Sequence, residues 1–319
     1  MALTIRDLLV QGAQMALVLL AAPFLTGVVR VFKARLVRRR GPPLIQPYRD
    51  LVRLLRKEAT IAENASFLFR VWPYLIFAAT WIAAALIPTF AAGLAFSWTA
   101  DLIAIVALLG AERFFLALAG MDVGTAFGGI GASREGMIAA LAEPALIMIV
   151  FTLALIAGST QLSTIAEFMQ SPAVGLRVSL ALALIALIMV ALAENARMPI
   201  DNPATHLELT MVHEAMVLEY SGRHLALIEL ASSLKLVVYV SLIACVFLPW
   251  GIAPAASDGT ELVIGAGTYL LKLVVCGIAL AVFETSIAKL RVFRAPDFIG
   301  AALMLGLLAV LLRFVSQGL

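Results

Sequence analysis

Long uninterrupted apolar runs constrain this chain more than any other feature. A membrane-spanning helix needs about 20 mainly apolar residues, and most of the runs are close to that size. Hydrophobic residues make up 63% of the chain and charged residues 13%, a balance that is rare among soluble globular proteins. We therefore predict an all-α, polytopic membrane protein with eight transmembrane helices in one domain over 1–319. The predicted spans are 8–29, 71–90, 102–118, 138–156, 178–193, 225–248, 262–283 and 298–312.

The basic residues are distributed unevenly between the segments that connect these runs. Ten of the 23 lie between Lys33 and Arg70, six more follow in the third, fifth and seventh segments, and the even-numbered segments hold almost none. Since basic residues favour the cytoplasmic side, both termini are expected on the non-cytoplasmic side of a bacterial inner membrane. The first run has neither a basic leader nor a cleavage site, so it is expected to remain as a helix. This distribution indicates membrane topology rather than nucleic-acid binding.

The first connecting segment contains a short stretch with helical periodicity at 46–58. Leu51, Leu54 and Leu55 fall on one face, and the charged residues fall elsewhere. The spacing predicts an amphipathic helix lying at the membrane interface. Two roles remain open for it, an anchor on lipid headgroups and a docking surface for a soluble partner.

Several ionisable residues fall inside the predicted spans. Each costs about 2.5 to 3.5 kcal/mol on insertion scales, so such residues are rarely accidental. Glu112 and Arg113 are adjacent and therefore about 100° apart on a helix, so each needs a partner on another helix. A structural ion pair is one explanation for each residue, but together they favour an internal polar path. The set comprises Glu112, Arg113, Glu143, Glu229, Lys235 and Lys272.

The fifth connecting segment, 194–224, is rich in acids and holds all three histidines of the chain. Asp201-Asn202-Pro203 predicts a helix start and Gly222 a helix end. On one continuous helix Glu208 and Glu219 would share a face. These carboxylates could exchange protons, their pKa values raised by burial and mutual repulsion, although a solvated acidic loop is the alternative.

Metal binding is not expected in this chain. His213-Glu214 resembles the start of a zinc-protease helix, but no histidine stands four residues after His213. Cys245 and Cys276 both lie inside apolar runs, and two cysteines cannot ligate an iron–sulfur cluster. We therefore expect no metal site and no cofactor-binding site.

The motifs resemble the family of the first membrane subunit of respiratory complex I, subunit 1. The residues that carry this resemblance are Arg39-Arg40-Gly41-Pro42, Gln46-x-Tyr48-Arg49-Asp50, Ala193-Glu194-x-x-Arg197-x-Pro199-x-Asp201 and Glu219-Tyr220-Ser221-Gly222. Within that family the chain is most similar to the membrane subunit of energy-converting group 4 [NiFe] hydrogenases, of the formate hydrogenlyase subunit 4 or hydrogenase-4 component C type. That similarity is carried by Arg113-Phe114-Phe115, Gly131-Ala132-Ser133-Arg134-Glu135, Glu143-Pro144, Ser233-Leu234-Lys235 and Phe283-Glu284-x-Ser286.

The resemblance implies a non-catalytic subunit that joins a cytoplasmic module to antiporter-like membrane subunits. The module would consist of hydrogenase large and small subunits, with the [NiFe] site and the iron–sulfur clusters in those partners. The implied proton-relay residues are Glu143, Glu194, Asp201, Glu208, Glu219, Lys235 and Lys272, and Glu229 is added to them because it falls inside a predicted span. The implied docking residues are Arg35, Arg39, Arg40, Gln46, Arg49, Asp50, Arg134 and Glu135.

Two alternative functions are less favoured by the sequence. One is the quinone-chamber membrane subunit of an NADH-quinone oxidoreductase (complex I), and the other is a free-standing ion carrier, which the absence of paired repeats opposes. The chain also departs from the family pattern after Pro203, where Ala204-Thr205-His206 replaces an acidic triplet. A histidine at that place could relay protons near neutral pH.

Overall fold

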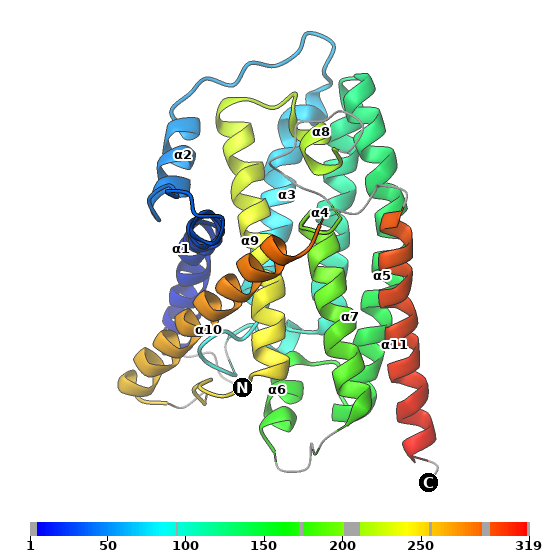
Figure 1. The fold of residues 1–319 in the computed structure, drawn as a ribbon. Helices are drawn as coiled ribbons and strands as arrows, with labels where there is room; N and C mark the ends of the chain where they lie inside the picture. Colours follow the sequence, from blue (N-terminus) through cyan, green and yellow to red (C-terminus); the bar gives the residue numbers. More distant parts are fainter. Residues whose placement is uncertain are drawn as a thin grey trace.

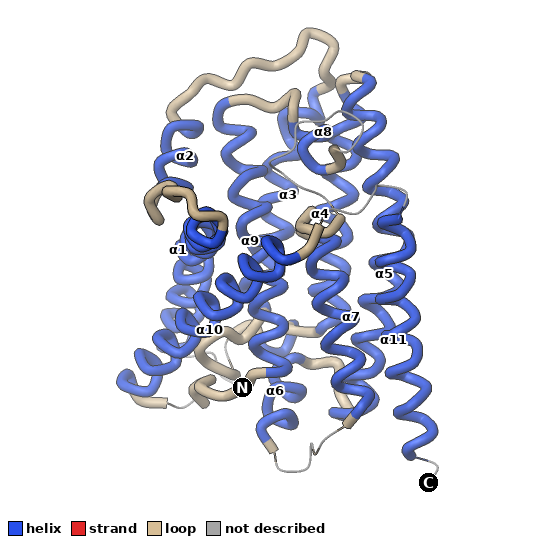
Figure 2. The backbone as a smooth tube through the Cα atoms, viewed as in Figure 1, coloured by secondary structure: helices blue, strands red, loops and turns tan. Residues whose placement is uncertain are grey.

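The computed structural model of the protein describes residues 5–93, 95–171, 175, 177–200, 211–254, 257–288 and 294–317. Across these ranges the chain forms helices and two isolated β-bridges (Figure 2), which confirms the all-α prediction. The long helices are α1 (Ile5–Leu36), α3 (Phe67–Leu86), α4 (Leu102–Asp122), α5 (Ala126–Ala157), α9 (Gly222–Phe247), α10 (Gly259–Ser286) and α11 (Ala295–Gln317). The shorter ones are α2 (Gln46–Leu55), η1 (Ser97–Thr99), α6 (Leu162–Gln170), α7 (Val178–Glu194) and α8 (His213–Val217).

Each predicted apolar run corresponds to one helix. Seven helices within the described ranges are long and apolar enough to cross a membrane, and α7 is an apolar helix of 17 residues. The predicted boundary was wrong for α5, which begins at Ala126 instead of residue 138. Glycines and polar residues lower the hydropathy of its first turns, while the Thr125 side chain caps the helix by accepting from the Gly128 amide.

The helix α9 packs against α1, α3, α7 and α10. Its buried side chains run without a break from Leu234 to Leu242, so this part of the helix is enclosed on all sides. The helix α3 packs against α4 and α9, α11 packs against α5 and α7, and α1 packs against α10. Figure 1 shows α10 crossing the bundle obliquely. The short helix α2 lies beside α1 and the first half of α9.

Alternate connecting segments meet at opposite ends of the bundle. At one end, bridges join Ala91 to Ala253 and Asp101 to Gln161, which brings the second, fourth and sixth segments together. At the other end, the Thr60 amide donates to Ser221 Oγ at 2.8 Å, linking the first and fifth segments. The start of α1 and the end of α11 lie at the first of these ends, opposite α2 and α8 (Figure 1).

Candidate functional site

Five charged side chains on four helices form a continuous series of ion pairs in the interior. Lys235 Nζ on α9 lies 2.7 Å from Glu112 Oε2 on α4 and 3.4 Å from Glu194 Oε2 on α7. Arg113 of α4 pairs with Glu194, and its Nε lies 3.0 Å from Glu135 Oε1 on α5. These side chains are only 2% to 12% exposed. We call the series Glu135–Arg113–Glu194–Lys235–Glu112 the ion chain.

The helical geometry of α4 explains why the ion chain joins so many helices. Glu112 and Arg113 point in directions about 100° apart, so Glu112 faces α9 while Arg113 faces α5 and α7. The expectation that each residue pairs with another helix is confirmed. Since a buried charge without its partner is strongly destabilising, these contacts hold α4, α5, α7 and α9 in one arrangement.

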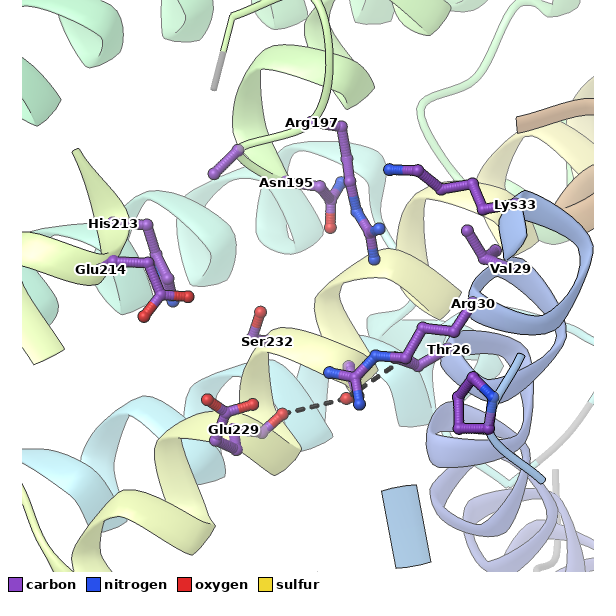
Figure 3. Close-up of a pocket in the computed structure, with 13 residues that line it drawn as sticks. Thr26, Val29, Arg30, Lys33, Asn195, Arg197, His213, Glu214, Glu229 and Ser232 are labelled. Atoms are coloured by element: carbon purple, nitrogen blue, oxygen red, sulfur yellow. Dashed lines mark hydrogen bonds between the residues drawn. The ribbon is translucent and has the colours of Figure 1, made fainter. Parts of the chain in front are cut away.

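A charged cavity of about 500 Å³ lies between α1, α8, α9 and the segment that follows α7 (Figure 3). One wall carries Lys33 and Arg30 of α1, and the opposite side carries His213 and Glu214 of α8. Glu229 of α9 contributes a further carboxylate. The cavity therefore combines acids, bases and a histidine around a space that can hold water.

The cavity and the ion chain are neighbours along two elements. Asn195 and Arg197, which line the cavity, directly follow Glu194 of the ion chain. On α9, Glu229 and Lys235 are six residues apart, which is about 9 Å along a helix. The cavity therefore lies close to the ion chain.

A second set of ion pairs closes the cavity toward α10. The buried Glu284 carboxylate lies 2.7 Å from Lys33 Nζ and 3.5 Å from Arg197 Nη1. Burial lowers the pKa of the Arg197 guanidinium, Arg30 acts in the same direction, and Glu284 opposes both. These contacts attach the end of α10 to α1 and to the segment after α7.

Two predicted relay residues lie apart from the ion chain. Glu143 lines a groove of about 600 Å³ between α4 and α5, among mostly apolar side chains. Lys272 donates from Nζ to the Leu248 carbonyl oxygen at 2.6 Å and to the Trp250 carbonyl oxygen. Lys272 thus satisfies backbone carbonyls where α9 ends.

The fifth connecting segment differs from the prediction. Asp201 and Glu208 lie outside the described residues, and the described helix, α8, ends at Val217, so one continuous helix through Glu219 is wrong. The half-buried Glu219 follows in a turn. The next residue, Tyr220, stacks on Phe69, with ring centroids 4.0 Å apart, and its hydroxyl donates to the Phe69 carbonyl oxygen at 3.1 Å. Burial raises the pKa of the Tyr220 hydroxyl.

Gly222 was predicted to end a helix, but it is the first residue of α9. Its φ of +54° favours glycine, and an added Cβ would lie 2.5 Å from the Glu58 carbonyl oxygen. The glycine therefore allows the start of α9 to contact the end of the first connecting segment.

Most predicted docking residues lie at the end of the bundle that carries α2. Arg35, Arg39, Arg40 and Arg49 extend from the end of α1 and from α2, and Arg39 and Arg40 are exposed. The side chains of Gln46 and Asp50 hydrogen-bond to each other at 3.1 Å on α2.

Arg134 and Glu135 belong to α5 instead of a connecting segment. Arg134 Nη1 donates to the Met211 carbonyl oxygen at 2.7 Å, and Glu135 enters the ion chain. The sequence did not predict this role of Glu135, because the low hydropathy of the first turns of α5 placed Glu135 in a connecting segment. It also missed the Lys33–Glu284 pair, although both residues carry charge at the ends of apolar runs.

Among the described residues, no three His, Cys, Asp or Glu side chains come together as a metal site. Both cysteines, Cys245 and Cys276, are free.

A family model described as NADH dehydrogenase matches residues 10–315. The chain belongs to this family, that of complex I subunit 1. It is 35% identical over 282 residues to formate hydrogenlyase subunit 4 of Escherichia coli (strain K12), covering 88% of this chain and 91% of the relative. It is also 35% identical to hydrogenase-4 component C of the same organism, covering 88% and 87% of the two chains.

Other members of the family are more distant. The corresponding membrane subunit of the NADH-quinone oxidoreductase of Bacteroides thetaiotaomicron is 31% identical over 216 residues, covering 64% of this chain and 57% of the relative. A chain in the structure of the membrane-bound sulfane sulfur reductase, an archaeal respiratory membrane complex, has the same fold with a TM-score of 0.83. That match covers 97% of this chain and 100% of the other at 18% identity. The chain therefore lies on the hydrogenase branch of the family.

Proposed function

We propose that this chain is the membrane anchor and proton-pathway subunit of a hydrogenase-type, complex I-related oxidoreductase. The observation that carries the proposal is the buried ion chain beside a charged cavity. Ionisable groups at membrane depth are typical of proton relays. The 35% identity to formate hydrogenlyase subunit 4 and hydrogenase-4 component C supports the hydrogenase type.

In this proposal the chain moves protons and holds the partners, while electrons stay in other subunits. A [NiFe] site and iron–sulfur clusters belong to the hydrogenase large and small subunits, and antiporter-like subunits extend the membrane arm. The cavity collects protons at the end of the bundle that carries α2 and passes them toward the ion chain. Glu219 and the carboxylates at 201 and 208 are further candidates for this route.

The proposed topology has eight crossings, with α7 as the shortest, in a bacterial inner membrane. The end with α2 and α8 faces the cytoplasm, and both termini face the other side, because the basic residues concentrate near α2. The helix α2 then lies at the membrane interface, where exposed Ile45, Val52 and Leu55 can meet lipid or a partner. A place in the quinone chamber of an NADH-quinone oxidoreductase is less favoured, since the relative of that class from Bacteroides thetaiotaomicron is 31% identical, against 35% for the hydrogenase relatives.

The docking part of the proposal is tested with Arg39 and Arg40, which are exposed beyond the end of α1. A surface that binds these arginines should be acidic. Replacing both arginines with Glu should therefore detach the soluble module, because the new carboxylates would repel that acidic surface. The measurement is co-purification of the hydrogenase-type subunits from solubilised membranes, with Arg39→Lys/Arg40→Lys as the charge-preserving control. Full retention of the module in the Glu variant would contradict the proposed docking face, and a chain isolated alone with hydrogenase activity would contradict the anchor role.

A further inference from the structure

The ion chain alternates in charge and begins and ends with an acid. Its order is Glu135, Arg113, Glu194, Lys235, Glu112, with each neighbour in ion-pair contact. Three carboxylates therefore face two cations. If all five groups were ionised, one negative charge would remain without compensation in a site that is 2% to 12% exposed. Buried uncompensated charge is strongly unfavourable, so the ion chain is neutral only when one carboxylate holds a proton.

The contacts decide which carboxylates can hold that proton. Glu194 meets both Arg113 and Lys235, so its charged form is stabilised from two sides. Glu135 contacts only Arg113, and Glu112 contacts only Lys235. Each of these cations also pairs with Glu194. The proton therefore belongs at one of the two ends.

Two pairing arrangements satisfy this charge balance. With the proton on Glu135, Lys235 pairs with Glu112 and Arg113 pairs with Glu194. With the proton on Glu112, Lys235 pairs with Glu194 and Arg113 pairs with Glu135. The structure is closer to the first arrangement, because Lys235 Nζ is 2.7 Å from Glu112 and 3.4 Å from Glu194. Glu135 is also the more exposed end, at 12% against 3% for Glu112.

We propose that the ion chain carries one exchangeable proton, which passes between Glu135 and Glu112, so that Glu112 is a further proton-carrying residue of this subunit. The inference rests on the proposed function in proton conduction. One O–H bond breaks at Glu135, one forms at Glu112, and the two cations each shift by one partner. The net charge of the ion chain stays at zero throughout.

Tyr239 on α9 is a buried titratable group near the ion chain. Its fully buried hydroxyl has no hydrogen-bond partner among the described residues. It lies within electrostatic range of Arg113, of both end carboxylates and of Glu143. Among the described residues, Tyr239 from α9 and Glu143 from α5 are further titratable groups near the ion chain.

The first experiment is infrared difference spectroscopy of the intact purified complex upon a change of pH, in H₂O and D₂O. A protonated carboxyl group with a deuterium-sensitive C=O band is expected in the wild type. The band should disappear in Glu112→Gln, because two carboxylates then balance two cations and no acid needs a proton. Glu135→Gln should remove the same band for the same reason, and Glu112→Asp should retain it. Glu167→Gln, at an exposed acid on α6, is the control and should also retain it.

The second experiment measures protons translocated per electron in sealed vesicles that contain the complex. Glu112→Gln should reduce this ratio at least several-fold while electron transfer continues, and Glu112→Asp should restore part of it. An unchanged infrared band together with an unchanged ratio in Glu112→Gln would overturn the inference. If the wild type translocates no protons, the proposed function fails, and the infrared band still decides whether the ion chain holds a proton. Should Glu112→Gln not assemble, Glu135→Gln provides the same test from the other end.

Discussion

At the residue scale, Glu284 shows how one buried carboxylate positions a helix end. Replacing it with Gln leaves Lys33 and Arg197 without their shared acid. We expect Glu284→Gln to lower the free energy of unfolding by about 2 kcal/mol, because two cations lose their acid. The loss stays below that of a fully buried pair, since water still reaches part of the Lys33 and Arg197 side chains. The measurement is denaturation in mixed detergent micelles.

The matched control is Glu261→Gln, the same substitution at an exposed acid in the first turn of α10. It should change the free energy of unfolding by less than about 0.5 kcal/mol. Equal losses in the two variants would show that the contacts of Glu284 contribute nothing specific to stability.

At the element scale, the five-residue helix α8 is seated on glycines of its neighbours. A Cβ added at Gly131 of α5 would lie 2.9 Å from Met216 Cγ and 3.0 Å from Ala215 Cβ. We expect Gly131→Val to displace α8, because overpacking costs about 1 to 3 kcal/mol. In a protein that lacks Cys245 and Cys276, the buried Ala215→Cys should then react with a water-soluble maleimide about tenfold faster.

Gly136→Val on the same helix serves as the control, because nothing lies within 4 Å of an added Cβ there. It introduces the same β-branched residue into α5 without a neighbour to displace. Similar labelling rates for Gly131→Val and Gly136→Val would contradict the proposed seating of α8.

At the scale of the whole molecule, the two groups of connecting segments should lie on opposite sides of the membrane. In a protein without Cys245 and Cys276, an impermeant thiol reagent added to the non-cytoplasmic side should label Gln161→Cys and leave Glu63→Cys unlabelled. Washed inverted vesicles should give the opposite pattern. Labelling of both positions from one side would rule out the proposed topology, and a fully reversed pattern would invert it.

The sequence predicted much of this architecture because helices in a membrane must be long and apolar. Every predicted span corresponds to a helix, and the separate partners of Glu112 and Arg113 follow from helical geometry alone. The prediction missed the first turns of α5 because they consist of small and polar residues, whose low hydropathy does not indicate a membrane helix. The pairing of Glu135 with Arg113, and of Lys33 with Glu284, depends on which helices are neighbours, and a single sequence contains no direct signal for that.

The two bridges at the end of the bundle opposite α2 have a consequence for biosynthesis. The Asp101–Gln161 bridge joins segments on either side of α4 and α5, whereas the Ala91–Ala253 bridge requires α9 as well. Because a chain leaves the ribosome from its N-terminus, the first bridge can close about 90 residues before the second. The second, fourth and sixth segments would therefore be fastened in a fixed order, and α9 would enter a bundle in which α4 and α5 already hold their places.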